Sequence, residues 1–271
     1  MPSTNKNTDE NIDDRTDALL ISKGWREEEL VDWNKPLLTQ VSKLGHNYFE
    51  WVHSPAPDRQ IRLFESNLLE SLSVCSWKMV PTFWLPILTL MLYCSHGTLR
   101  SVGTETWLPF LFGGVTVTRQ AIPVLFLCGV VMWTFVEYAV HRWLFHLKPP
   151  ANSRLLITMH FLFHGQHHKT PMDAGRLVFP PAPALALGVC IYAVFLTVFP
   201  HGMANAVCSG VVLGYIIYDL IHYYLHHGSP AMPYFKRLKH YHVQHHFVNQ
   251  QKAFGISTKF WDYPFGTSMP E

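Results

Sequence analysis

The chain has 271 residues, enough for one or two domains, and 15% of them are charged whereas 14% are aromatic. That balance is typical of a membrane protein rather than a water-soluble one. A net charge of +2 without any basic tract argues against a nucleic-acid partner. The five cysteines are scattered through or beside apolar segments and none forms a C-x-x-C motif. Neither a disulfide framework nor a thiolate metal site is therefore expected.

The first 72 residues precede any apolar span. Residues 1–24 are polar and mixed in charge. They lack the apolar core of a signal peptide, so we predict a disordered tail. Residues 25–72 mix aromatic and charged side chains, beginning with "WREEELVDWNKPLL" (Trp25 to Leu38). We predict an ordered segment that lies along the membrane surface, with a soluble amphipathic helix as the alternative.

Four apolar stretches predict four transmembrane helices and thus an all-α, polytopic membrane protein. They cover approximately residues 74–96, 121–140, 178–199 and 206–225. Residues 177–218 contain no Asp, Glu, Lys or Arg, and this length is twice the roughly 20 residues that one helix needs to cross a bilayer. The turn residues of "PHGMAN" (Pro200 to Asn205) divide this stretch into a helical hairpin.

Lysine and arginine gather in the segments that follow the second and fourth spans. The residues are Arg142, Lys148, Arg154, Lys169 and Arg176 after the second span, and Lys236, Arg237, Lys239, Lys252 and Lys259 after the fourth. Between the first and second spans there are only Arg100 and Arg119. The positive-inside rule therefore predicts that both termini and the second loop are cytosolic.

Most of the 17 histidines fall in the same two cytosolic regions. The first region holds His141, His146, His160, His164, His167 and His168, and the second holds His222, His226, His227, His240, His242, His245 and His246. The topology and the histidine positions rest on different residues, so their agreement supports both. The isolated His46, His53, His96 and His201 are interpreted as ordinary histidines of a membrane interface.

The spacing of these histidines indicates metal ligands. In "HGQHH" (His164 to His168) and "HVQHH" (His242 to His246), three histidines stand at i, i+3 and i+4 and would share one face of a helix. "HYYLH" (His222 to His226) places two at i and i+4. His141 and His146 are five residues apart, so both can reach one centre only if the helix loosens there.

Ten imidazoles, in groups of two, three, two and three, are too many for one ion and suit two. Imidazole is a ligand for iron, zinc, copper and nickel, but not for calcium or magnesium. A structural zinc site is the competing explanation, but it closes with four ligands, often thiolates. The sequence therefore predicts a histidine-rich helical cap on the cytosolic side that holds two metal ions.

Further polar residues near these motifs are candidates for supporting roles. His160, His227 and His240 lie close to the ligand groups, and Glu137 and Asp219 lie one turn before His141 and His222. Either carboxylate could accept a hydrogen bond from the ring N–H of the neighbouring histidine, whose other ring nitrogen would bind the metal. Arg176 could hold the carboxyl or headgroup of an acyl substrate, or could serve as a positive anchor at the membrane surface.

The order H-x(4)-H, H-x-x-H-H, H-x(3)-H and H-x-x-H-H resembles the fatty acid hydroxylase and sterol desaturase superfamily. Longer strings narrow this to the fatty acid 2-hydroxylase family. They are "HFLFHGQHHKTPMDAGRLVFPP" (160–181), "YDLIHYYLHHGSP" (218–230), "FGISTKFWDYPFGT" (254–267), "LVDWNKPLL" (30–38) and "YFEWVH" (48–53). The resemblance covers roughly residues 25–271 and implies a fatty acid hydroxylase domain over residues 73–271.

The resemblance implies an endoplasmic reticulum monooxygenase that uses O2 to hydroxylate carbon 2 of long-chain fatty acyl groups destined for ceramides and other sphingolipids. It implies the metal ligands His141, His146, His164, His167, His168, His222, His226, His242, His245 and His246. Zinc binds such ligands but has no redox chemistry, so iron is expected in the active form. No residue beyond the ligands is expected to be catalytic.

Many members of the family carry a fused cytochrome b5 domain with a His-Pro-Gly-Gly haem motif, which this sequence lacks. No bound haem is therefore expected, and electrons should come from separate cytochrome b5 and its NAD(P)H-dependent reductase. The same histidine motifs also occur in sterol desaturases and sterol methyl oxidases. The alternatives are thus an enzyme of that type or a non-catalytic regulatory relative.

Overall fold

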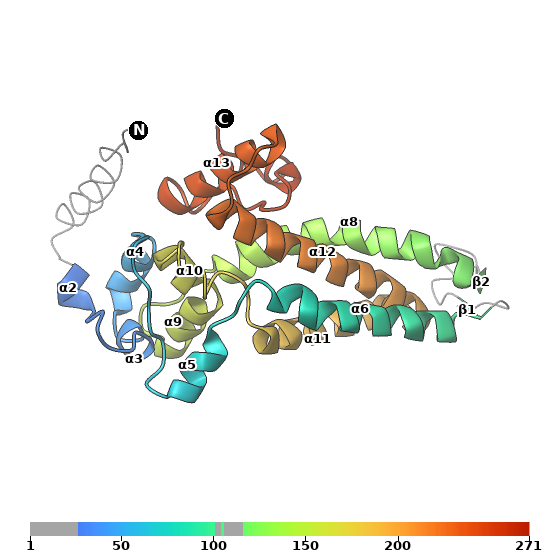
Figure 1. Ribbon diagram of the computed structural model, residues 1–271, viewed down its shortest axis with the longest axis horizontal. Helices are drawn as coiled ribbons and strands as arrows, with labels where there is room; N and C mark the ends of the chain where they lie inside the picture. The colour runs from blue at the N-terminus through green and yellow to red at the C-terminus, as the bar shows by residue number, and fades with distance from the viewer. Residues whose placement is uncertain (1–26, 101–103, 106–115, 271) are drawn as a thin grey trace, which may run out of the picture. The chain divides into compact units, whose positions relative to one another are not determined.

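The computed structural model describes residues 27–100, 104–105 and 116–270. These residues are mainly helical. Their strands are β1 (Thr104–Glu105) and β2 (Thr116–Val117), which pair antiparallel, Thr104 opposite Val117. The predicted all-α class is confirmed, whereas the predicted tail at residues 1–24 lies outside the described residues. The chain divides into two compact units (Figure 1). The first unit contains Met1–Ser73 and Phe145–Asp173, and the second contains Val74–Leu144 and Ala174–Glu271.

The second unit holds four helices that are long and apolar enough to cross a membrane. They are α6 (Met79–Thr98), α8 (Ile122–Ala139), α11 (Pro181–Val198) and α12 (His201–His227). Helix α6 begins five residues later than predicted. Helix α12 begins five residues earlier, because two extended residues, Phe199 (ψ 140°) and Pro200 (ψ 153°), complete the turn after α11. The chain is therefore a multi-pass membrane protein, as its composition predicts.

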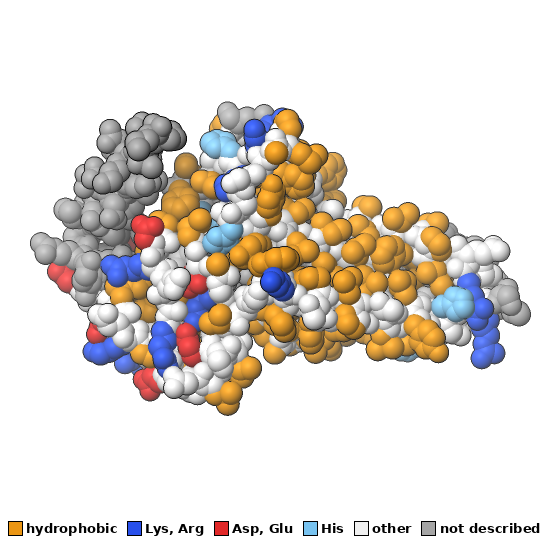
Figure 2. Space-filling model, viewed as in Figure 1, with side chains coloured by type: hydrophobic (Ala, Val, Ile, Leu, Met, Phe, Trp, Pro, Cys, Tyr) orange, Lys and Arg blue, Asp and Glu red, His pale blue; other side chains and the backbone are white. Residues whose placement is uncertain are grey.

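Helix α12 is the centre of this membrane bundle. More than half of its apolar window is buried (56%), against 22% or less for the other three helices. Helices α6, α8 and α11 pack against it and expose hydrophobic side chains over most of their length (Figure 2). Their outward faces are those that lipid would cover, whereas protein buries more than half of α12.

Glycines allow α8 and α12 to approach at backbone distance. A Cβ atom on Gly210 would lie 1.9 Å from the carbonyl oxygen of Phe126, and one on Gly129 would lie 1.9 Å from that of Val207. One turn further along α12, Gly214 leaves room for the side chain of Trp133. Small residues at four-residue spacing are a common device for close packing of helices in membranes.

The remainder of the second unit follows α12. Helix α13 (Pro233–Phe247) packs against α12, and the chain then forms a loop with a short 3₁₀ turn at Phe260–Asp262. Lys239 of α13 donates a hydrogen bond to the carbonyl oxygen of Gly228 (2.9 Å), just beyond the end of α12. A cation near the C-terminus of a helix interacts favourably with the helix dipole. The bond from Lys239 therefore fixes α13 against α12.

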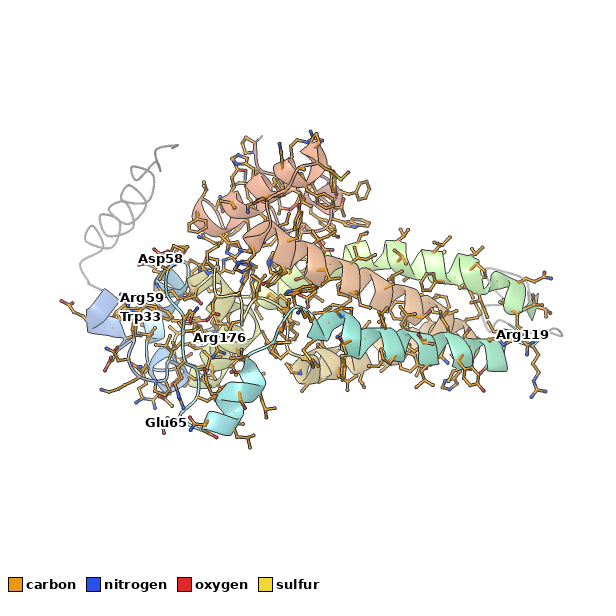
Figure 3. The ribbon with its side chains drawn as sticks, in the orientation of Figure 1. Trp33, Asp58, Arg59, Glu65, Arg119 and Arg176 are labelled. Atoms are coloured by element: carbon orange, nitrogen blue, oxygen red, sulfur yellow. The ribbon has the colours of Figure 1, made fainter. Side chains whose placement is uncertain are left out.

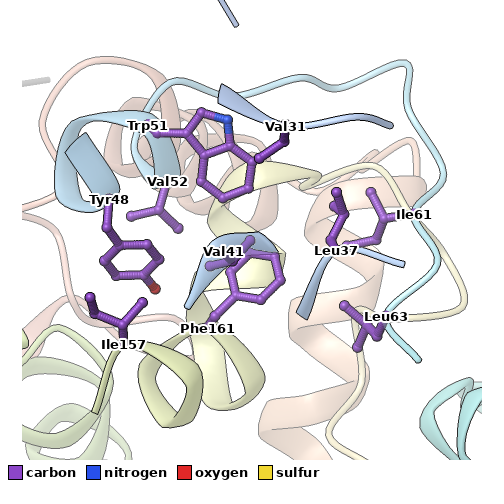
Figure 4. Packing of buried hydrophobic residues seen from close by; sticks show 10 residues of the cluster. All are labelled: Val31, Leu37, Val41, Tyr48, Trp51, Val52, Ile61, Leu63, Ile157 and Phe161. Carbon is purple, nitrogen blue, oxygen red and sulfur yellow. The ribbon is translucent and has the colours of Figure 1, made fainter. Parts of the chain in front are cut away.

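The first unit packs the N-terminal segment against the loop that follows the second span. Its helices are α2 (Glu27–Leu30), α3 (Leu38–Val41), α4 (Tyr48–Val52), α5 (Asn67–Ser73), α9 (Arg154–His160) and α10 (Gln166–Lys169). Their core contains Trp51 of α4 and Ile157 and Phe161 of the later segment (Figure 4). On the exposed side, the guanidinium group of Arg59 lies 4.8 Å from the ring centre of Trp33 (Figure 3).

A buried lysine connects the two segments of the first unit. Lys169 is fully buried and donates hydrogen bonds to the carbonyl oxygens of Trp51 (3.1 Å) and Ser54 (2.5 Å). Its ammonium group also lies 4.7 Å from the ring centre of Trp51. The backbone adds a bond from Ala56 N–H to the Lys169 carbonyl (2.7 Å). These bonds hold α4 against α10, so residues 48–56 are a structural part of this unit.

We predict that Gly210→Ala separates α8 from α12 and destabilises the protein by roughly 1–3 kcal/mol, the usual cost of overpacking. Thermal unfolding of the purified chain, followed by tryptophan fluorescence, measures this. The matched control is Gly97→Ala in α6, where a Cβ would meet nothing within 4 Å. Equal unfolding temperatures for the two variants would show that α8 and α12 are not in backbone contact.

Candidate metal centre

Two π-helical segments adjoin the predicted ligands. The chain is π-helical over Val140–Phe145, which contains His141 and ends one residue before His146. This is the loosening that the five-residue spacing of these histidines requires. A second π-helix at Phe161–Gly165 joins α9 to α10 and contains His164. Short π-helical turns are frequent at functional sites.

Four histidines of the second unit converge on one point. His222 and His226 come from α12, and His242 and His246 come from α13. All four are buried, and each offers a ring nitrogen within 4.8 Å of the others. The Nε2 atom of His242 lies 3.1 Å from Nε2 of His222, 2.8 Å from that of His226 and 3.1 Å from that of His246.

Hydrogen bonding does not explain this convergence. A neutral imidazole has only one N–H and one lone pair, so Nε2 of His242 cannot satisfy three neighbouring nitrogens at once. Imidazole nitrogens bind zinc at about 2.0–2.1 Å, which leaves adjacent ligands of one ion roughly 3 Å apart. The observed spacings of 2.8–3.1 Å fit such a set. The residues present therefore fit a metal ion that is coordinated by nitrogen.

His141 and His245 form a second group in the same unit, and backbone carbonyls orient both. Their rings meet edge-on at 4.8 Å between centres. Nδ1 of His141 donates to the carbonyl oxygen of Phe254 (2.6 Å), and Nδ1 of His245 donates to that of Lys252 (2.6 Å). Each bond fixes the tautomer and leaves Nε2 available to a metal. Between the two carbonyls, Ala253 has φ at +59°, a left-handed conformation that a non-glycine residue rarely adopts.

Two buried carboxylates hold this loop in place. Asp262 accepts hydrogen bonds from the N–H groups of Phe254 (2.9 Å) and Gly255 (2.9 Å) and from the hydroxyl of Thr267 (2.7 Å). Burial raises the pKa of Asp262 above its ordinary value, and these donors oppose that rise.

Glu137 is the second carboxylate, and it accepts from Ile256 N–H (2.8 Å) and from the N–H and hydroxyl of Ser257. The prediction that Glu137 accepts the spare N–H of His141 is therefore wrong, because the Phe254 carbonyl does so.

The first unit brings together its own set of predicted ligands. His146, His164 and His168 are buried and place ring nitrogens within 4.8 Å of one another. Nε2 of His164 lies 3.0 Å from Nε2 of His168. His167 is buried beside them, with its ring centre 5.4 Å from that of His164. The i, i+3, i+4 spacing of "HGQHH" is thus realised on the π-helix and α10.

Helix α4 and the residue directly after it, His53, supply two side chains of this neighbourhood that sequence reasoning missed. The hydroxyl of Tyr48 and Nδ1 of His160 share a hydrogen bond (2.5 Å). Burial raises the pKa of Tyr48 and lowers the pKa of His160 to about 4, so both groups are neutral. The ring of His53 lies 5.4 Å from that of His168 and 6.0 Å from that of His146. The string "YFEWVH", already part of the resemblance, was the only sequence signal for this role.

The other supporting candidates have different surroundings. Asp219 is buried and accepts a hydrogen bond from the hydroxyl of Tyr215 (3.0 Å). Arg176 is only 6% exposed (Figure 3), which does not fit an anchor on an exposed membrane surface. His227 and His240 are exposed, and His227 packs on the ring of Tyr223. These two histidines are therefore poor candidates for a role beside the ligands.

An apolar groove of about 360 Å³ lies on the second unit, but it does not open on the four histidines. Its lining residues are Leu220, Ile221, Tyr224, Ala231, Met232 and Phe235. At about 100° per residue, its α12 residues lie on the side of that helix opposite His222 and His226. The groove therefore has no direct access to these ligands.

Comparisons with known proteins agree with this arrangement. A family model described as fatty acid hydroxylase matches residues 126–267. A fatty acid 2-hydroxylase of Macaca fascicularis is 46% identical over 248 residues, which are 90% of this chain and 66% of the relative. The chain thus spans just under two thirds of that relative's length. A dihydroceramide fatty acyl 2-hydroxylase of Arabidopsis thaliana is 40% identical over 242 residues, 89% of this chain and 94% of that protein.

One solved structure supports the fold. Full-length scs7p, in which only the hydroxylase domain is visible, superposes with a TM-score of 0.77 at 31% identity. The alignment covers 94% of this chain and 93% of the other.

We predict that Asp262→Asn loosens the loop that orients His141 and His245. The amide NH2 group of asparagine cannot accept a hydrogen bond from the N–H group that it would face. The unsatisfied buried donor should lower the free energy of unfolding by about 1–3 kcal/mol. The unfolding temperature should fall by roughly 2–4 °C per kcal/mol. Asp58→Asn, at an exposed position, is the matched control. If both variants unfold at the same temperature, Asp262 does not secure the loop.

Proposed function

Since this chain belongs to the fatty acid hydroxylase family, we propose that it is a membrane monooxygenase that hydroxylates carbon 2 of long-chain fatty acyl groups. The observation that carries this proposal is the convergence of three buried histidine nitrogens on Nε2 of His242, which is itself buried. Relatives at 40–46% identity are named as fatty acid 2-hydroxylases and a dihydroceramide fatty acyl 2-hydroxylase. We infer that the products enter ceramides and other sphingolipids.

We propose that the ten predicted histidines hold two metal ions. Support comes from each unit taken by itself. The second unit gathers four histidines at one point and orients two more through backbone carbonyls. The first unit gathers three and buries His167 beside them. Imidazole donors without carboxylates suit iron or zinc, and the oxidation of a C–H bond requires a redox-active metal, so iron is proposed for the active form.

The reaction would insert one oxygen atom of O2 into the C–H bond at carbon 2. Two electrons and two protons would convert the other oxygen atom to water. Protein side chains alone do not oxidise an unactivated C–H bond, and a bound redox metal supplies that chemistry. Electrons would come from separate cytochrome b5 and its NAD(P)H-dependent reductase.

The chain's own residues would position and shield the reacting groups. The carbonyls of Phe254 and Lys252 hold His141 and His245 in the tautomer that presents Nε2. Buried surroundings exclude water, which protects reactive species from side reactions. Arg176 is proposed to bind the carboxyl or headgroup of the acyl substrate, because a buried guanidinium is well suited to a bidentate anion contact.

We propose that the enzyme resides in the endoplasmic reticulum membrane with both termini and the histidine-bearing segments on the cytosolic side. The distribution of lysine and arginine among the connecting segments supports this orientation. Soluble reductase and cytochrome b5 domains could then reach the metal-bearing side of the protein.

The metal assignment predicts a difference between two adjacent histidines of α12. The His226→Ala variant should lose metal, because His226 belongs to the converging group, whereas the His227→Ala variant should keep it, because His227 is exposed. Metal content of the purified full chain, measured by mass spectrometry, should be two ions per chain for wild type and His227→Ala. Unchanged content in His226→Ala would contradict the assignment.

The activity predicts that this chain restores 2-hydroxylated sphingolipids to hydroxylase-deficient cells. The double variant His167→Ala, His168→Ala should not, although it accumulates in the membrane. His240→Ala, an exposed histidine, should behave as wild type. Lipid mass spectrometry measures all three. A wild-type chain that restores no 2-hydroxylated species while altering sterol oxidation would assign it to the sterol branch, and no effect on either would favour a regulatory relative.

A further inference from the structure

Two short helices of the first unit expose apolar side chains at identical spacing. On α5, Leu68, Leu69 and Leu72 are 68%, 49% and 67% exposed. On α9, Leu155, Leu156 and Met159 are 70%, 47% and 38% exposed. In both helices the three residues stand at i, i+1 and i+4, so they form one stripe along the helix. Exposed apolar stripes of this kind mark contact surfaces.

The opposite faces of these helices fix the stripes outward. The carboxylate of Glu70 accepts hydrogen bonds from the N–H groups of Leu63 (2.9 Å) and Phe64 (3.0 Å), which turns the polar side of α5 towards the protein. On α9, Ile157 is fully buried in the hydrophobic core of the first unit. Neither helix can therefore rotate its leucines inward without breaking these contacts.

The chain itself limits how far α5 can lie from the bilayer. Only residues 74–78 separate α5 from the membrane helix α6. Trp77, which is 39% exposed, and Lys78, whose ammonium group lies 5.9 Å from the Trp77 ring centre, are typical of the membrane–water interface. Four residues from Ser73 to Trp77 span at most about 14 Å. The stripe on α5 is thus tethered close to the headgroups.

We propose that the stripes of α5 and α9 bind the lipid surface of the bilayer that the four helices cross. The first unit would then rest on the membrane through these two helices, with the leucines in the boundary between headgroups and acyl chains, as in interfacial helices. Helix α9 continues through the π-helix into α10, which carries His167 and His168. Contact of α9 with lipid therefore sets the depth of these ligands relative to the bilayer.

This depth has a chemical consequence that rests on the proposed function. Carbon 2 is adjacent to the carboxyl carbon of an acyl group and so lies near the headgroups, whereas later carbons lie deeper. Ligands held at the headgroup level would meet carbon 2 first. The stripes are thus positioning elements for the site of oxidation.

Site-directed spin labelling of the full chain in phosphatidylcholine–phosphatidylserine vesicles tests the proposal. Nitroxides are placed at Leu69→Cys, Leu72→Cys and Leu156→Cys, with Glu65→Cys and Asp58→Cys as exposed controls in the same unit (Figure 3). The exposed Cys94, Cys128 and Cys190 are first replaced by alanine, whereas the buried Cys75 and Cys208 remain. Retained metal content reports that each labelled chain is folded.

Power saturation compares collisions with O2, which dissolves in the bilayer, and with a nickel chelate, which stays in water. We expect a severalfold higher ratio of oxygen to nickel accessibility at the three leucine positions than at the two controls. Equal ratios at all positions would overturn the proposal, because the stripes would then face water. Protection from both reagents would also overturn it, in favour of a protein partner or a second copy. Hydroxylation in cells is a separate readout, so failure of one proposal does not entail failure of the other.

Discussion

The arrangement of the second unit depends on neutral imidazoles that lie about 3 Å apart in a buried place. The Nε2 atoms around His242 lie 2.8–3.1 Å from it, too many for the single proton or lone pair that this atom offers. Burial keeps imidazoles uncharged because it penalises the protonated form, and only the uncharged form binds a metal. The helix ends that carry them are fixed in turn by Lys239, which joins the start of the α12–α13 loop to α13.

The loop of residues 252–262 shows how local strain is held in place. A non-glycine residue in the left-handed region, as at Ala253, costs roughly 1–2 kcal/mol. Each hydrogen bond to a charged group contributes about 1.5–3 kcal/mol, and Asp262 accepts two from this loop and one from Thr267. The bonds therefore outweigh the strain. The left-handed conformation of Ala253 lets the carbonyls on either side of it, those of Lys252 and Phe254, face two different histidines.

Sequence reasoning identified the features that depend on residues close together in the chain. Apolar length alone predicts the membrane helices, and the i, i+3, i+4 pattern alone predicts which histidines share a helix face. It failed where the partner is distant in the chain. Glu137 pairs with residues 119 and 120 positions away, and His141 with a carbonyl 113 positions away. A backbone carbonyl has no signature in the sequence, because every residue carries one. His53 appeared isolated for the same reason, since its neighbours in space, His146 and His168, follow 93 and 115 residues later.

Contacts between residues far apart in the chain also explain why the segment before the first span is part of the folded protein. A buried ammonium group is costly to desolvate unless it is paired or well hydrogen-bonded. Lys169 gains two carbonyl acceptors and the face of Trp51, all from the N-terminal segment. An apolar residue could fill the same space but would make no hydrogen bonds, whereas the bonds of the ammonium group fix α4 and α10 in one register. That register places Tyr48 against His160 and His53 beside His168. The N-terminal segment thus determines how rigidly the histidines of the first unit are held.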